Sequence, residues 1–415
     1  MRMKKRFDRR SARRRRNASG FNKGNAGPIL KLIGAVLGSL AALTLTAFAV
    51  MLALQFLFKI DTPIKPLVVR DAKTETAAPD PHTSTAPDAG PTPVPTPHPM
   101  AAFDAENAEK ELVFPSEMNY GYLGDPYCHN GKIICSAGKL ADGKVRLGKL
   151  IIYDIMTAEV SEVMIEPVND HLLSPVFNDR YLVYFDANNT IGGGFIRMVD
   201  LTKQPISPIT IKAVYIGQPE IKLYENYITW IERTGSDRDK LFVCDLKTQE
   251  TTVVQYFDRR SYGTSIPDFG GGKLVWADEG GAADNNSSIC TIDIETAEMT
   301  SFNPGSYVHD PEFNGSVYVW IDSHHAPGAR LMFSDGVNPA SVIAENVAEF
   351  GLSDKFVAYG MDEAVYVYVF ATGESYRVNP SWQKAQFLGT SNGVVMWMDV
   401  TSRERDIIKF VIPPM

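Results

Sequence analysis

One short strand phrase recurs seven times between residues 105 and 415, and this repeat constrains the fold more than any other feature of the chain. The phrase "GGGKLVWADE" at residues 270–279 has relatives in "YENYITWIER", "FNGSVYVWID" and "TSNGVVMWMD". Aligning the copies superimposes one large apolar residue, with a cysteine in its place in the first copy. Successive copies lie 49, 46, 46, 44, 39 and 38 residues apart. The aligned positions are Cys135, Tyr184, Trp230, Trp276, Trp320, Tyr359 and Trp397.

Further marks stay in register with this residue. A proline stands nine residues ahead of it in four copies: Pro126, Pro175, Pro267 and Pro311. An acid follows two residues after it in five copies: Asp186, Glu232, Asp278, Asp322 and Asp399. A second phrase of the "FVCDLKTQE" type comes about 15 to 19 residues later in four copies. A repeat near 44 residues that holds four short strands is typical of a β-propeller blade.

The last unit supplies only three strands before residue 415, which would leave an unpaired edge. We therefore predict that "KELVFPSE" at residues 110–117 pairs with "DIIKFVIP" and closes the ring. The predicted fold is all-β, a seven-bladed propeller closed by an N-terminal strand. A ring of six blades remains the alternative, because the first unit is the weakest.

Several phrases of the repeat resemble a known family. "DPYCHNGKIIC", "SPVFNDRYLVY" and "DPEFNGSVYVW" resemble the repeat of TolB-like propellers, a WD40-like type, and "YDIMTAE" resembles the ending of their third strand. The resemblance covers about residues 110–415 and implies a rigid disc that serves as a binding platform. The Ser-Pro-Asp-Gly turn of the family is replaced here by "HNGK", "NDRY" and "GGGK".

The N-terminal quarter of the chain reads as a membrane anchor and a spacer. Residues 1–31 hold twelve Lys and Arg and one acid, and residues 32–58 carry no charge over 27 positions. A helix of that length exceeds the roughly 30 Å hydrocarbon layer, and the basic tail should stay in the cytoplasm. Residues 59–104 are rich in Pro and Thr and predict a disordered extracytoplasmic linker. The propeller at residues 105–415 would then lie outside the cell membrane on a single-pass, type II protein.

Composition excludes some classes of function. Residues 32–415 hold 29 bases and 48 acids, which argues against nucleic-acid binding by the propeller. No C-x-x-C pair exists, so we expect no zinc site, no other metal and no cofactor. The four cysteines are expected to be buried free thiols, and one disulfide between strands is the alternative. They are Cys128, Cys135, Cys244 and Cys290.

Candidate site residues are few. The recurrent aromatics, Tyr184, Trp230, Trp276, Trp320, Tyr359 and Trp397, are interpreted as packing between blades and not as a ligand-stacking ring. The acids two residues later are interpreted as turn residues, with a carboxylate ring as the alternative. Asp125, His309 and Asp310 precede inner strands and are weak binding candidates at the channel mouth. His324 and His325 are interpreted as part of an exposed loop.

No catalytic motif is recognisable, and we assign no catalytic residue. The sequence therefore favours a non-catalytic module that binds protein, peptide or cell-wall ligand at a bacterial envelope. The alternative is a propeller enzyme of the lyase or glycoside hydrolase type with its active site at the channel mouth. That alternative requires two or three carboxylates, or a pair of His, to converge at the mouth.

Overall fold

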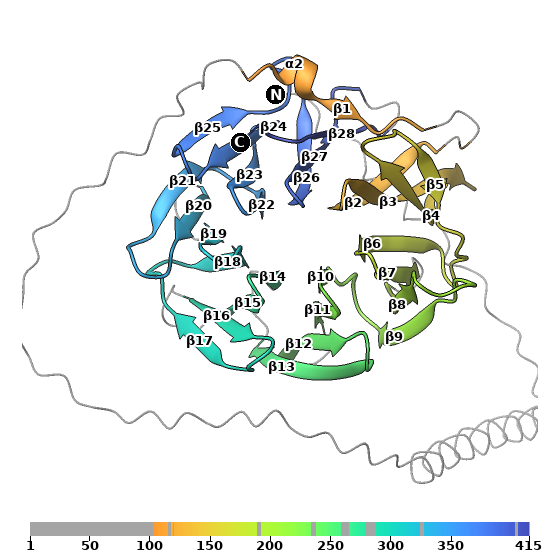
Figure 1. Cartoon of the computed structure of the whole chain (residues 1–415), viewed down its shortest axis with the longest axis horizontal. Coiled ribbons are helices and arrows are strands. Elements are labelled where there is room, and N and C mark those ends of the chain that lie inside the picture. The colour runs from red at the N-terminus through yellow and green to blue at the C-terminus, as the bar shows by residue number, and fades with distance from the viewer. Residues whose placement is uncertain are drawn as a thin grey trace, which may run out of the picture. The chain divides into compact units, whose positions relative to one another are not determined.

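Seven four-stranded antiparallel sheets surround a central axis in the computed structural model (Figure 1). The structure describes residues 103–114, 118, 120–188, 192–233, 238–258, 265–278, 287–323, 328–402 and 406–414. The seven-bladed propeller is thus confirmed, and the alternative of six blades is wrong.

Each blade runs from an inner strand beside the channel to an outer strand at the rim. The first blade comprises β2 (Tyr122–His129), β3 (Lys132–Ala141), β4 (Lys144–Asp154) and β5 (Val160–Glu162). The second comprises β6 (His171–Phe177), β7 (Tyr181–Asn188), β8 (Gly193–Asp200) and β9 (Ile209–Val214). The third comprises β10 (Lys222–Tyr224), β11 (Tyr227–Glu232), β12 (Arg238–Asp245) and β13 (Glu250–Asp258).

The remaining blades follow the same order. The fourth comprises β14 (Asp268–Gly270), β15 (Lys273–Asp278), β16 (Ser288–Asp293) and β17 (Met299–Phe302). The fifth comprises β18 (Val308–Phe313), β19 (Tyr318–Asp322), β20 (Arg330–Ser334) and β21 (Ser341–Glu345). The sixth comprises β22 (Glu349–Leu352), β23 (Phe356–Met361), β24 (Ala364–Val369) and β25 (Glu374–Arg377).

The seventh blade joins both ends of the described chain. It comprises β26 (Ala385–Ser391), β27 (Val394–Asp399), β28 (Ile408–Val411) and, as its outer strand, β1 (Lys110–Glu111), which follows the short helix α2 (Ala105–Ala108). Lys110 pairs with Phe410, and the N–H of Leu112 donates to the Ile408 carbonyl at 3.0 Å. The N-terminal closing strand predicted from the sequence is therefore present.

The repeated aromatics lie on the second strands and are buried between blades. The Trp230 side chain of the third blade packs in one apolar cluster with Phe185 of the second, and Trp320 of the fifth packs with Val275 of the fourth. Tyr184, Trp276, Tyr359 and Trp397 are equally buried, as is Cys135 at the first copy. Because the apolar faces of each sheet pack only against the sheets of the two neighbouring blades, their apolar surface is buried when the sheets are arranged in a circle. All four cysteines are free and buried, as expected.

The predicted tail at residues 1–31, membrane helix at residues 32–58 and most of the linker at residues 59–104 lie outside the described residues. Within the described ranges, no helix has the length and apolar character needed to cross a membrane.

Candidate functional site

One register position on each inner strand faces the channel. It lies eight residues before the repeated aromatic and pairs with the residue just ahead of that aromatic: Lys222 with Thr229, Asp268 with Val275, and Glu312 with Val319. The seven residues in this position are Tyr127, Val176, Lys222, Asp268, Glu312, Gly351 and Gly389. Three consecutive blades thus direct a lysine and two acids toward one axis. We call Lys222, Asp268 and Glu312 the channel triad.

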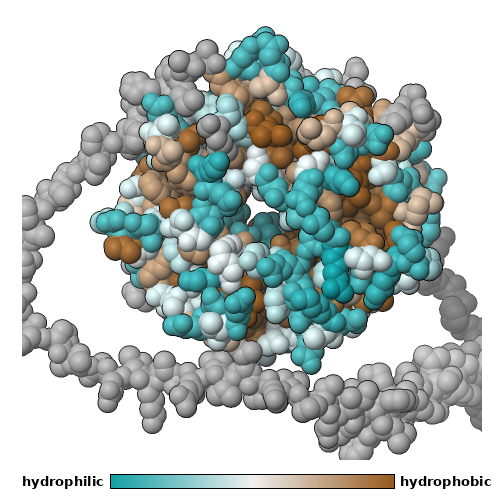
Figure 2. Space-filling model, in the orientation of Figure 1, coloured by the Kyte–Doolittle hydropathy of each residue, from teal (hydrophilic) through white to brown (hydrophobic). Residues whose placement is uncertain are grey.

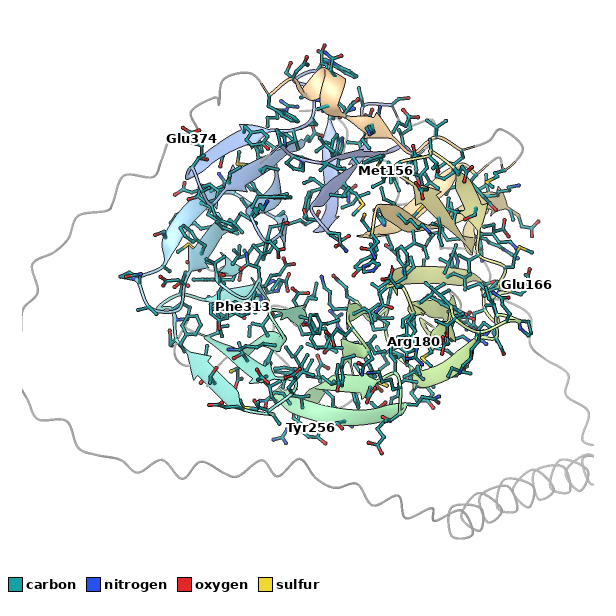
Figure 3. The ribbon with its side chains drawn as sticks, viewed as in Figure 1. Met156, Glu166, Arg180, Tyr256, Phe313 and Glu374 are labelled. Carbon is teal, nitrogen blue, oxygen red and sulfur yellow. The ribbon has the colours of Figure 1, made fainter. Side chains whose placement is uncertain are left out.

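Two cavities that share the channel triad occupy the channel. One has a volume of about 500 Å³, and its lining includes Glu220, Asp310 and Glu349 beside the triad. The other has a volume of about 590 Å³ and extends to Asp125 on the first blade. Figure 2 shows the corresponding hollow at the centre of the ring, with hydrophilic residues along much of its edge. Figure 3 shows side chains reaching toward this opening from the inner strands, whereas Tyr256 and Glu374 lie at the outer edge. Both volumes lie in the range of small-ligand sites.

The Lys222 ammonium is the cation of the channel triad. Its Nζ lies 3.3 Å from Glu220 Oε1, and its side chain keeps 26% of its exposure. Burial opposes its charge, but the charges of Glu220, Asp268 and Glu312 outweigh burial and raise the pKa of Lys222. The ammonium therefore stays protonated throughout the physiological range.

The two triad carboxyls are held in an environment that disfavours their ionised forms. Burial, followed by the charge of Asp268, raises the pKa of Glu312 to about 8, although Lys222 opposes the shift. Glu312 Oε2 also accepts the N–H of Leu352 at 2.5 Å. Burial likewise raises the pKa of Asp268, against the opposing effects of Lys222 and the N–H of Phe269. Glu312 is therefore a carboxyl group that carries its proton at neutral pH.

The wall contributed by the sixth and seventh blades bears no side chain at the same register position. A Cβ on Gly351 would lie 2.9 Å from the backbone nitrogen of Thr390, so only glycine permits this approach of β22 and β26. Gly389 has a φ of 142°, and a Cβ there would meet no atom within 4 Å. Both glycines line the first cavity, but Thr390 closes the space beside Gly351, so only Gly389 leaves open room there.

The candidates at the channel mouth, Asp125, His309 and Asp310, lie within β2 and β18 and not ahead of them as expected, and the two aspartates hold neighbouring blades together. Asp125 accepts the N–H of Ser174 on the next blade at 2.8 Å, and burial raises the pKa of Asp125. Asp310 accepts the N–H of Ile266 at 2.6 Å, and its carboxylate lies 3.0 Å from Nδ1 of His309. Both aspartates have positive φ at bulges in their strands and line the cavities. His324 and His325 lie outside the described residues.

Two of the five acids that follow the aromatics form ion pairs with an arginine on the adjacent strand of their own blade. Asp186 is fully buried and lies 3.2 Å from Arg197, while accepting the N–H groups of Val168 and Asn169. Asp322 pairs with an arginine of the adjacent strand at 2.7 Å. Within the described ranges, no group of three His, Cys, Asp or Glu side chains could hold a metal ion.

The channel triad was not predicted from the sequence. The predicted candidates Asp125 and Asp310 stand ahead of the aligned prolines, whereas two triad members follow Pro267 and Pro311 directly. The signal was present as a Lys, an Asp and a Glu at one fixed spacing from Trp230, Trp276 and Trp320.

No protein-family model matches the sequence, and no curated protein is similar to it. Solved propellers share its fold. The β-propeller domain of the Trilobed protease from Pyrococcus furiosus has a TM-score of 0.53 and 14% identity, over 70% of this chain and 93% of that chain. An oligogalacturonate lyase in complex with manganese has a TM-score of 0.51 and 14% identity, over 74% of this chain and 93% of that chain. An uncomplexed acylaminoacyl peptidase from Pyrococcus horikoshii has a TM-score of 0.51 and 12% identity, over 71% of this chain and 53% of that chain.

These comparisons correct one expectation. This chain spans about half the length of the acylaminoacyl peptidase, and at such low identity the similarity shows the fold alone. Even so, the matched propellers belong to peptidases and a lyase, which goes against the expectation that leaned toward a non-enzyme. The convergent carboxyls that the enzyme alternative requires are present in the channel, so that alternative is the better supported one.

Proposed function

We propose that this protein is an enzyme that cleaves glycosidic bonds by general acid–base catalysis in the central channel. The observation that carries the proposal is the channel triad: Lys222, Asp268 and Glu312, from three consecutive inner strands, lie around one cavity of about 500 Å³. Cleavage of a glycosidic bond requires two carboxyls, one that carries a proton and one that is ionised.

Glu312 serves as the general acid. Its pKa of about 8 means that the carboxyl group still carries a proton near pH 7, which it donates to the departing sugar oxygen. Asp268 serves as the carboxylate partner, because its negative charge is one of the causes that raise the pKa of Glu312 and so place the proton on Glu312. In that role it takes the proton of the attacking water or stabilises the positive charge that develops on the sugar ring.

The charge of the channel favours hydrolysis of a neutral or cationic glycan over elimination from a uronate. Five acids line the cavity of about 500 Å³, namely Glu220, Asp268, Asp310, Glu312 and Glu349, and Lys222 is the one base in its lining. Glu220 already engages that base at 3.3 Å. A polyanionic chain would be repelled, so we assign the hydrolase type within the lyase-or-hydrolase alternative.

We also propose that residues 32–58 anchor the protein in the cell membrane and that the ring faces outward on the proline-rich linker. The uncharged 27-residue run and the basic residues ahead of it support this orientation. The substrate would then be a glycan of the bacterial envelope, and the resemblance to TolB-like repeats is consistent with that location.

The test is hydrolysis of a panel of envelope-type glycans by the purified full chain, with release of reducing ends as the readout. Glu312→Gln and Asp268→Asn should each lower kcat by about 100-fold or more, which is the range for loss of an acid or base. Glu374→Gln, at the exposed outer edge, is the matched control and should leave kcat unchanged. Turnover that survives both channel variants would refute the assignment of the site.

A further inference from the structure

We propose that a further cavity, at the opposite end of the channel from Asp310, binds the sugars on the far side of the bond that is cleaved. This inference rests on the proposed function and adds that the substrate is a glycan chain long enough to extend past the carboxyls in both directions. The cavity has a volume of about 570 Å³, and we call it the far cavity.

The position of the far cavity follows from the course of the inner strands. Along β18, Asp310 and Glu312 line the cavity of about 500 Å³, and Asn314, just after the strand, lines the far cavity. The far cavity therefore lies where inner strands turn into second strands. Such turns from four consecutive blades border it, at Gly271, Asn314, residues 353–355 and residues 392–393.

The far cavity continues the channel. It shares Asp268, Phe269 and Leu352 with the cavity of about 590 Å³, which in turn shares the channel triad with the cavity of about 500 Å³. Asp268 lines all three cavities, so there is space on both sides of this carboxylate along the axis. A glycan whose bond lies at the triad carboxyls can therefore place sugars in both directions.

Aromatic rings from the same three blades as the channel triad line the far cavity. They are Tyr224, Phe269 and Phe313, and each follows a triad member by one or two residues. The ring centroids of Tyr224 and Phe269 lie 6.1 Å apart. Ile412, which is 57% exposed, adds apolar surface to the lining. Because a sugar ring has C–H groups on its faces, it packs well against such rings.

The polar groups of the far cavity suit an uncharged sugar. Its lining holds two acids, Asp268 and Asp354, and one base, Lys355, whereas five acids and one base line the cavity of about 500 Å³. Asp354 and Lys355 are exposed and can hydrogen-bond the hydroxyls at the edge of a sugar ring. Since the aromatic rings line a concave space that continues into the channel, the occupant is a narrow chain and not a flat protein surface.

The experiment measures binding without turnover. The full chain carrying Glu312→Gln is titrated calorimetrically with N-acetylglucosamine oligomers and with glucose oligomers of two and six sugars. Tyr224 lies two residues beyond Lys222, about 7 Å further along β10, so a hexamer covers its ring more fully than a dimer does. We expect the hexamer of at least one series to bind about tenfold more tightly than its dimer, a difference of about 1.4 kcal/mol.

Variants of one tyrosine test whether this advantage comes from the far cavity. Tyr224→Ala, added to the same chain, should remove the advantage of the hexamer and leave the affinity for the dimer unchanged. Tyr224→Phe keeps the ring and should preserve the advantage. Tyr256→Ala is the matched control, because Tyr256 is 53% exposed at the outer edge of the ring of blades (Figure 3). The Tm of each variant is measured, so that a loss of folding is not taken for a loss of contact.

A second measurement needs no substitution. For the unsubstituted chain, kcat/KM for hydrolysis should rise from the dimer to the hexamer. Absence of hexamer binding, equal affinities for dimer and hexamer, or a hexamer advantage that survives Tyr224→Ala would each overturn the inference. Cleavage of dimers as efficiently as hexamers would sink this inference and leave the proposed function standing. If the hexamer advantage depends on Tyr224 and no glycan is cleaved, the proposed function fails and the far cavity remains a sugar site.

Discussion

Closure of the ring can be tested with two adjacent residues that differ in burial. Leu112 follows β1 directly, is 3% exposed and packs in one cluster with Ile408 and Phe410 of β28. Val113, the next residue, is 62% exposed. If the N-terminal strand holds the seventh blade in place, truncation of Leu112 to alanine must destabilise the whole ring, and truncation of Val113 must not.

The size of the effect follows from the packing. Leu→Ala in a core costs about 2–5 kcal/mol, and this position lies next to an outer strand that can relax, so about 2.5 kcal/mol is expected. For about 310 folded residues, an unfolding entropy of about 2.1 cal/mol/K per residue gives about 0.65 kcal/mol/K in total. Leu112→Ala should therefore lower Tm by about 4 °C, whereas Val113→Ala should change the free energy of unfolding by less than about 0.5 kcal/mol.

The assay is differential scanning calorimetry of the full chain and both variants under identical conditions. Substitution of Lys409 by methionine is a second probe, because Lys409 lies 3.1 Å from both Glu109 and Glu111 across the closure. A Tm for Leu112→Ala that equals that of Val113→Ala would refute the reasoning, since the ring would then be stable without the contact that closes it.

Other predictions concern pH and buried charge. Because Glu312 must be protonated to act, kcat/KM should fall as pH rises through about 8, and a flat profile between pH 6 and 9 would contradict its role as the acid. Burial lowers the pKa of His171, so on acidification the unfolded chain binds a proton at this residue before the folded chain does. The contribution of His171 to the free energy of unfolding should therefore be complete above about pH 6.5 and decrease below it. His171→Gln should reduce this pH dependence in urea titrations. Asp186→Ala should cost about 3–5 kcal/mol in the same titrations because Arg197 loses its partner, while Glu166→Ala, at a side chain 84% exposed, should cost less than about 0.5 kcal/mol.

The architecture was predictable because the same physical requirement is restated in every copy. Each second strand must fill the space between two sheets, so Trp230, Trp276, Trp320 and Trp397 recur at a spacing that a single sequence reveals. The closing strand was predictable for a related reason. The last repeat unit holds only three strands, and an open edge is a liability that proteins avoid.

The site was not predictable by the same route, because repetition carries no information about it. At the channel position the blades differ: Val176 packs into the core between blades and Gly351 abuts β26, whereas the channel triad lines the cavities. A lysine at residue 222 or an acid at residue 268 looks like an ordinary strand residue until the sheets are arranged in a circle. Only then do side chains 46 and 44 residues apart in the chain face one cavity.

The same differences divide the channel into sectors. Two blades present Tyr127 and Val176 at this position, the next three present the channel triad, and the last two present glycine. The charged sector provides the reacting groups, and the open space beside Gly389 provides room for what they act on. A substitution that fills the space beside Gly389 and leaves the channel triad unchanged would therefore separate the effect on substrate binding from the effect on the reaction. Gly389→Ala places a methyl group in the cavity and should raise KM for a glycan more than it lowers kcat. Because Gly389 has a φ of 142°, the alanine also strains β26, so the Tm of the variant is measured beside its kinetics. A loss confined to kcat would mean that the space beside Gly389 does not face the substrate.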